Sequence, residues 1–243
     1  MLPGPATPLA SCRGGVTGPA DDVTVIDAAA RAGRRPLVSL ADVLLPPRCA
    51  LCDRHGRGIC MACAARLPPP LGGAPPGGLD ALVSLCAYDG AGRDLVLALK
   101  RANRRDAARP LGEALAEAAR PVVGPGPAVV TWAPTTPARR RARGFDQAEV
   151  LARSVARAAV LPAARLLWRN GGPQAGLDRL ARLSGPAFAA SGLPTSAVVL
   201  VDDVVTSGAT MAAAAAALRS AGARQVVGVT VARAREAGTR RRR

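Results

Sequence analysis

Short apolar runs alternate with amphipathic segments over residues 79–233. The runs are rich in β-branched residues and predict buried strands, whereas the segments between them repeat their apolar positions at helical spacing. Strands that alternate with helices imply an α/β fold with a doubly wound, mostly parallel sheet. The predicted strands are 79–88, 128–132, 198–201 and 225–231, and the predicted helices are 93–101, 109–120, 147–159 and 211–218.

The most informative run, VVLVDDVVTSGAT, covers residues 198–210. Asp202 and Asp203 fall at the carboxyl end of a predicted strand, where ligands bind in open α/β sheets. Adjacent carboxylates repel each other and need an outside partner such as a sugar hydroxyl or a metal ion. A turn follows, and Thr210 is the predicted N-cap of a helix whose free amides would bind a phosphate. The alternative is an ordinary strand, acidic turn and capped helix, and we favour the ligand site. The turn residues are Thr206, Ser207, Gly208, Ala209 and Thr210.

This segment resembles the phosphoribosyl pyrophosphate fingerprint of the type I phosphoribosyltransferases. The resemblance implies that Thr206–Thr210 hold the 5-phosphate. It also implies that Asp202 and Asp203 are the catalytic residues and hydrogen-bond the ribose 2- and 3-hydroxyls, with magnesium bridging the diphosphate. In such enzymes the end of a neighbouring strand binds pyrophosphate through backbone amides, which Trp132 and Ala133 would offer here.

Four cysteines form two C-x2-C pairs separated by seven residues. This spacing is typical of tetrahedral thiolate ligation of a structural zinc ion. Two disulfides are the competing interpretation, but the sequence shows no secretion signal, and we therefore favour zinc and a cytoplasmic location. His55 lies between the pairs and is interpreted as a bystander because four thiolates already complete the site. The predicted zinc ligands are Cys49, Cys52, Cys60 and Cys63.

Composition divides the chain into segments. Residues 1–35 are rich in Pro, Gly and Ala without periodicity and predict a disordered extension. Residues 36–67 would form a zinc-ribbon module, and the prolines and glycines of 68–78 predict a linker. The main domain would cover 79–233, followed by a basic tail at 234–243. No apolar run reaches the ~20 residues of a membrane-spanning helix.

The formal charge of the chain is +16, and Lys100 is the only lysine. A surface this basic attracts polyanions, including single-stranded DNA, although aromatic residues for base stacking make up only 2% of the chain. Arg139–Arg143 predict a basic loop: either a lid in which Arg141 and Arg143 clamp pyrophosphate, or a solvated or nucleic-acid-binding loop. Lys100 would either reach the diphosphate or stabilise the end of a helix.

The arrangement as a whole resembles the competence protein F (ComF) family over residues 40–233. That resemblance implies a zinc ribbon joined to a phosphoribosyltransferase-like domain, and a link to DNA uptake. The alternative function is therefore a non-catalytic competence adaptor that binds single-stranded DNA or competence-machinery proteins. Asp146 stands where the family often has Asn. The residues that carry the resemblance are Leu44–Pro47, Tyr88–Gly90, Lys100, Pro110–Gly112, Arg141–Ala148, Gln174, Leu177, Arg179 and Arg182.

Overall fold

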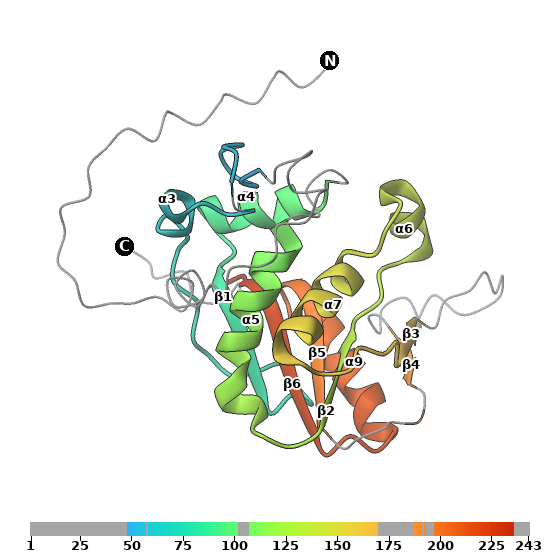
Figure 1. Cartoon of the computed structure of the whole chain (residues 1–243). Coiled ribbons are helices and arrows are strands. Elements are labelled where there is room, and N and C mark those ends of the chain that lie inside the picture. Colours follow the sequence, from blue (N-terminus) through green and yellow to red (C-terminus); the bar gives the residue numbers. More distant parts are fainter. Residues whose placement is uncertain are drawn as a thin grey trace, which may run out of the picture.

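A parallel sheet of four strands lies at the centre of the protein (Figure 1). The computed structural model describes residues 48–56, 58–101, 107–169, 187–190, 192 and 197–235. The strands of this sheet are β1 (Ala81–Ala87), β2 (Ala128–Trp132), β5 (Ala197–Val205) and β6 (Gln225–Arg233). Their order is β1-β6-β5-β2, and every pairing is parallel, as the alternation of strands and helices predicts.

Strand β5 is longer than its apolar run. The hydrophobic pattern predicts an end near Val201, but pairing with β6 continues, with Asp202 opposite Thr230 and Val205 opposite Arg233. Strand β2 stops where Trp132 pairs with Val201. Backbone hydrogen bonds to β6 therefore carry β5 through two charged residues that hydrophobicity alone would assign to a turn.

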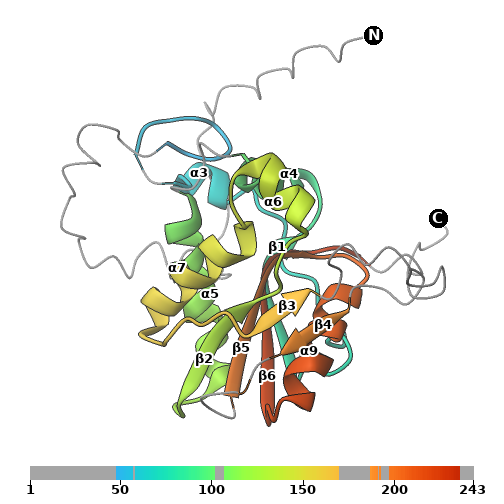
Figure 2. The same ribbon diagram turned by 90° about the vertical axis from the view of Figure 1, so that its right-hand side faces the viewer.

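Helices cover both faces of the sheet, which confirms the doubly wound arrangement (Figures 1 and 2). Successive strand residues point to opposite faces. Accordingly, Val199 and Val201 of β5 belong to the core beneath α4, α5 and α7, and Val198 and Leu200 belong to the core beneath α9. The helices are α4 (Gly90–Leu99), α5 (Ala108–Val123), α6 (Pro137–Arg143), α7 (Gln147–Ala159) and α9 (Ala209–Ser220).

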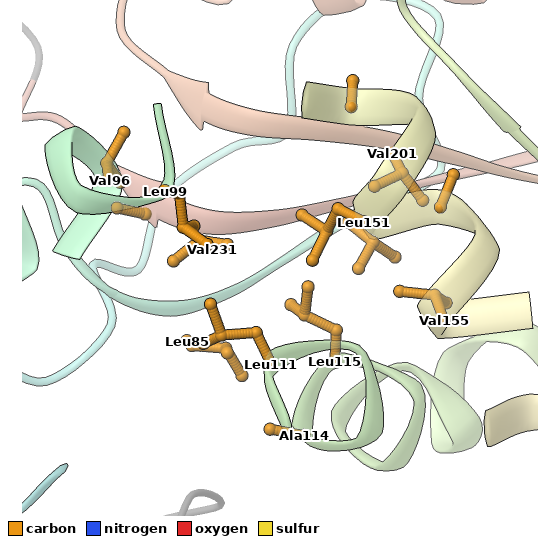
Figure 3. Close-up of a cluster of buried hydrophobic side chains, with 14 of the residues drawn as sticks. Leu85, Val96, Leu99, Leu111, Ala114, Leu115, Leu151, Val155, Val201 and Val231 are labelled. Carbon is orange, nitrogen blue, oxygen red and sulfur yellow. The ribbon is translucent and has the colours of Figure 1, made fainter. Parts of the chain in front are cut away.

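The larger core is aliphatic. Figure 3 shows Leu111 and Leu115 of α5 beside Leu151 and Val155 of α7, with Val201 reaching them from the sheet. Each of these side chains is fully buried or nearly so. Complete burial of a Leu or Val side chain contributes about 1.5–3 kcal/mol, so branched aliphatic residues supply the core that scarce aromatic residues do not.

A short antiparallel hairpin, which the sequence does not predict, lies beside α9. Strand β3 (Leu167–Arg169) pairs with β4 (Phe188–Ala190), and both pack against the second core. The chain reaches the hairpin along the outer edge of the sheet, where Ala163 forms a bridge with Val130 of β2. Strands of three residues are too short for a period-2 pattern to be recognised.

The cysteine segment and helix α3 (Met61–Ala64) pack on the larger core through Ala50, Leu51 and Ile59. The following segment, 68–78, lies along the strand ends: Pro68 and Pro69 accept a hydrogen bond from the Ala87 amide, and Gly73 and Ala74 accept hydrogen bonds from Arg233. The expectations for residues 1–47 and for the tail beyond residue 235 lie outside the described residues.

Candidate functional site

Asp202 and Asp203 stand just beyond the end of the neighbouring strand. Because β2 stops opposite Val201 while β5 continues, the two acids lie on a step at the carboxyl edge of the sheet. Both side chains are half-buried. The Asp202 carboxylate accepts a hydrogen bond of 2.8 Å from the Asp203 amide. The step leaves the acids open on the side where β2 has ended, which is the position of ligand sites in open α/β sheets.

Lys100 neutralises one of the two acids. It is the C-cap residue of α4, and its Nζ lies 3.0 Å from Oδ2 of Asp203, with little of either side chain exposed. Burial raises the pKa of Asp202 well above its usual value, and the charge of Asp203 raises it further; the Asp203 amide and the Lys100 charge only partly oppose this. The only lysine of the chain therefore lies in the site, next to Asp203.

The turn after β5 exposes the start of α9. Gly208 is the N-cap residue of α9, with φ 77°, and it provides no side-chain cap. The prediction that Thr210 is the N-cap of this helix is wrong, because helix α9 already starts at Ala209. The first amide to bond into the helix is that of Ala212, and no described residue accepts a hydrogen bond from the Thr210 or Met211 amides. A helix start with free amides binds phosphate well.

Packing also requires a glycine at position 208. A Cβ there would lie 3.0 Å from the ring of Pro76, which belongs to the segment between the cysteines and the main sheet. The positive φ is costly for any residue with a side chain. The turn is held by the close approach of Pro76 and by the exposed Ser207 side chain, whose hydroxyl accepts a hydrogen bond of 3.4 Å from the Ala209 amide. The Thr206 side chain is also exposed.

The backbone amides of Ala133 and Thr135, just beyond the end of β2, are already used. The Ala133 amide donates to the Val201 carbonyl, and the Thr135 amide donates to Oδ2 of Asp146 at 2.9 Å. Pro134, between them, has no N–H to donate. The expected use of the Ala133 amide for pyrophosphate is therefore wrong, because the strand ladder occupies it. The expected use of the Trp132 amide stays a prediction. Asp146 also caps α7 by accepting from the Ala148 amide.

The predicted basic loop is a short helix. Helix α6 begins after the N-cap Thr136, whose hydroxyl accepts from the Arg139 amide, and it ends at Gly144 in the left-handed conformation. Arg140 and Arg141 are exposed, and Arg143 is half-buried. No ion pair or side-chain hydrogen bond joins these three arginines to another residue in the described part of the chain. Their guanidinium groups are available to an anion.

Arg169 of β3 lies close enough to Asp202 for its charge to be affected, and the sequence does not single it out. Its Nε donates to the Pro134 carbonyl at 3.2 Å, and its guanidinium lies over the Phe188 ring, 5.2 Å from the centroid. Burial lowers the pKa of Arg169, and the charge of Arg139 adds to this, whereas Asp202 and Asp146 oppose it. No local pattern marks this residue, because the hairpin brings it to the site. Gln174, Arg179 and Arg182 lie outside the described residues.

The four cysteines converge on one point. Their Sγ atoms all lie within 4.8 Å of one another, and those of Cys52 and Cys60 are 3.6 Å apart. A tetrahedral zinc site with Zn–S bonds of about 2.3 Å places its sulfurs about 3.8 Å apart, so the donor set fits zinc. A disulfide would require about 2.05 Å. Burial raises the pKa of Cys49, but backbone hydrogen bonds, the largest from Cys60, lower it to about 7. His55 is not part of the cluster.

Comparison with known families covers the C-terminal part of the molecule. The family model described as the phosphoribosyl transferase domain matches residues 146–243. The comparison shows a phosphoribosyl transferase domain. It takes in the hairpin, the paired acids and the turn before α9, whereas Lys100, β2 and the four cysteines precede it. No curated protein matches the chain. Within the described residues, no helix has the length and hydrophobicity needed to cross a membrane.

Proposed function

We propose that this protein binds phosphoribosyl pyrophosphate with magnesium and transfers the phosphoribosyl group to an acceptor. One observation carries the proposal: the paired acids of β5 and the uncapped start of α9 are joined by a turn of a few residues within the phosphoribosyl transferase domain. Ribose 5-phosphate presents two vicinal hydroxyls and a phosphate. The carboxylates accept hydrogen bonds from the hydroxyls, and the amides of Thr210 and Met211 donate to the phosphate.

The charges in the site suit the diphosphate. Asp202 and Asp203 offer the oxygen ligands that magnesium prefers, directly or through water, and magnesium would neutralise the diphosphate charge. Arg141 and Arg143 of α6 provide guanidinium groups that can clamp phosphate oxygens in pairs. Lys100 is held beside the acids by its ion pair with Asp203 and lies within reach of the same ligand.

Transfer breaks the bond between the anomeric carbon and a diphosphate oxygen, and the electron pair leaves with the diphosphate. The acceptor forms a bond to the same carbon, and its proton passes to water. Positive charge develops on the ribose, where the Asp202 and Asp203 carboxylates stabilise it, and negative charge develops on the leaving group, where the arginines and Lys100 stabilise it. These residues would bind and orient the reactants without moving during the step.

Calorimetry with magnesium and phosphoribosyl pyrophosphate tests the proposal. We expect wild-type protein to bind, and D203N to bind about 10- to 100-fold more weakly because a charge-assisted hydrogen bond to the ribose is lost. D94N is the matched control, since Asp94 is an exposed carboxylate on α4. Release of pyrophosphate with a panel of bases and amines would identify the acceptor. Folded wild-type protein that gives no heat contradicts the proposal.

We also propose that the four-cysteine cluster binds one structural zinc ion, with no position left for substrate. Elemental analysis of the purified protein would then give one zinc per chain, and C63S would lose it. Protein that retains its fold with no bound metal argues against this assignment.

A second candidate function rests on α6. Its arginines lack partners among the described residues, and the chain carries a charge of +16. We propose, as the alternative, that this protein is a ComF-like competence adaptor. It would bind single-stranded DNA through this basic surface and contact competence proteins through its zinc module. Gel-shift affinities across a salt series would fall steeply, and replacing Arg140 and Arg141 by Gln would lower the slope by about 0.7 for each lost phosphate contact. Affinity equal to that of an unrelated basic protein speaks against the adaptor.

A further inference from the structure

Two backbone amides that could face a diphosphate beyond the end of β2 are already occupied. The Ala133 amide is bound within the sheet, Pro134 has no N–H, and the Thr135 amide is held by Asp146. Asp146 is buried and also caps α7, so it is not free to release that amide without exposing a helix end. A diphosphate placed next to the acids therefore cannot use these two amides, and side-chain donors would have to replace them.

Arg169 is a cation that the fold holds against the loop after β2, at the Pro134 carbonyl. Its Nε donates a hydrogen bond to the Pro134 carbonyl, which ties β3 to the loop after β2. Stacking on Phe188 fixes the plane of the guanidinium. Arginine has five N–H donors, and the terminal amino groups of Arg169 donate to no residue in the described ranges.

Charges of both signs surround this guanidinium. Besides burial, the pKa of Arg169 is affected by Arg139 of α6 and by Asp202 of β5. Two positive charges near each other are unfavourable, and an anion bound between them would relieve this. The ion pair of Lys100 with Asp203 lies on the α4 side. Lys100 and Arg169 are thus the cations near the paired acids, and of the two it is Arg169 that does not form an ion pair with either acid in the described ranges and that is held by a hydrogen bond and an aromatic contact.

We propose that Arg169 is a substrate-binding residue that recognises the diphosphate of phosphoribosyl pyrophosphate, in place of the occupied amides after β2. This inference rests on the proposed function and adds a residue to the same site. Its terminal amino groups would bind diphosphate oxygens as a planar fork, and Arg139 would add a second positive charge from α6.

Two ligands separate this role from a structural one. Ribose 5-phosphate carries the parts that β5 and α9 bind and lacks the diphosphate, whereas phosphoribosyl pyrophosphate carries both. We expect R169Q to lower the affinity for phosphoribosyl pyrophosphate with magnesium by about 10- to 100-fold and to leave that for ribose 5-phosphate within about 2-fold of wild type. R169K keeps the charge but not the fork, and we expect an intermediate affinity.

The matched control is R165Q. Arg165 lies on the same arm of the chain, is exposed and stacks on Trp168 at 5.7 Å, so its replacement removes the same charge and a similar aromatic contact. We expect R165Q to bind both ligands as wild type does. Binding of ribose 5-phosphate by R169Q also shows that the variant is folded at the site, and thermal unfolding checks the rest.

Three results overturn the inference. Equal losses for the two ligands in R169Q would show that Arg169 only supports the fold. Unchanged affinity for phosphoribosyl pyrophosphate would show that the diphosphate lies elsewhere, while the proposed function would stand. Wild-type protein that binds neither ligand would remove the proposed function and this inference with it.

Discussion

The proposed ribose-phosphate side of the site comes from one continuous segment, Asp202–Thr210, whereas the proposed diphosphate side is assembled from Lys100, residues 133–147 and Arg169. On the first side the strand, the acids, the turn and the helix start follow one another, and local backbone geometry places them. On the second side the positions depend on hydrogen bonds between distant segments, such as Thr135 to Asp146 and Arg169 to Pro134.

This difference affects how each side responds to change. A segment that is positioned by its own backbone fails when a backbone conformation is forbidden. An assembled side fails when one of its long-range contacts is cut, and it can fail alone. Ribose 5-phosphate and phosphoribosyl pyrophosphate report on the two sides separately, so variants on each side can be compared with the same pair of ligands.

The largest effect is expected for G208V. Valine at φ 77° costs about 1–2 kcal/mol in backbone strain, and its Cβ would press against Pro76, 3.0 Å away. We expect the affinities for both ligands to fall roughly 100-fold, because the amides that bind the phosphate move together. Calorimetry with each ligand measures this. G126V is the control, since Gly126 has no positive φ and open space around it. A loss confined to phosphoribosyl pyrophosphate would contradict the division into two sides.

An intermediate effect is expected for D146A on the other side. The change leaves α7 without its cap and the Thr135 amide without a partner, which together cost about 2 kcal/mol in the free energy of unfolding. We expect affinity for phosphoribosyl pyrophosphate to fall about tenfold and that for ribose 5-phosphate to change little. Denaturant unfolding and calorimetry provide the measurements. D146N keeps one of the two oxygen acceptors and turns an NH2 group toward the other backbone amide, so we expect a stability between those of wild type and D146A. Wild-type stability and affinity in D146N would rule out a role for both carboxylate oxygens.

The smallest effect is expected for D80N, at the opposite edge of the sheet. Asp80 forms an ion pair of 2.6 Å with Arg219. Burial alone would raise the Asp80 pKa, but the hydrogen bond from the Val226 amide and the charge of Arg219 lower it below its usual value. Because the Asp80 pKa is lower in the folded state, the pair stabilises the fold at pH values above the unfolded-state pKa of about 3.9. This stabilisation is lost as the pH falls through the folded-state pKa. D80N should therefore be less stable than wild type at pH 7, by under about 1 kcal/mol for an exposed pair, and equal to it near pH 2. Unfolding curves at both pH values test this, and altered ligand binding would contradict it.

Much of the fold could be predicted from the pattern of apolar and polar residues. Strand β2 and helix α7 have the predicted bounds, 128–132 and 147–159, because their apolar periodicity is strong and their caps are local. The bounds of β5 and the cap of α9 were mispredicted. Strand pairing with β6 overrides the polarity of Asp202 and Asp203, and the αL glycine ends the turn before Thr210. Helix α6 was predicted as a loop, since its arginines give no apolar period.

The sequence alone determined the paired acids, the phosphate turn and the cysteine quartet, because in each of them the chemistry lies within a few bonds along the chain. Tertiary structure alone decided that Lys100 pairs with Asp203, that Asp146 occupies the Thr135 amide and that Arg169 comes to the site. Those contacts join residues separated by many positions, and folding places them by filling a core that no local pattern specifies.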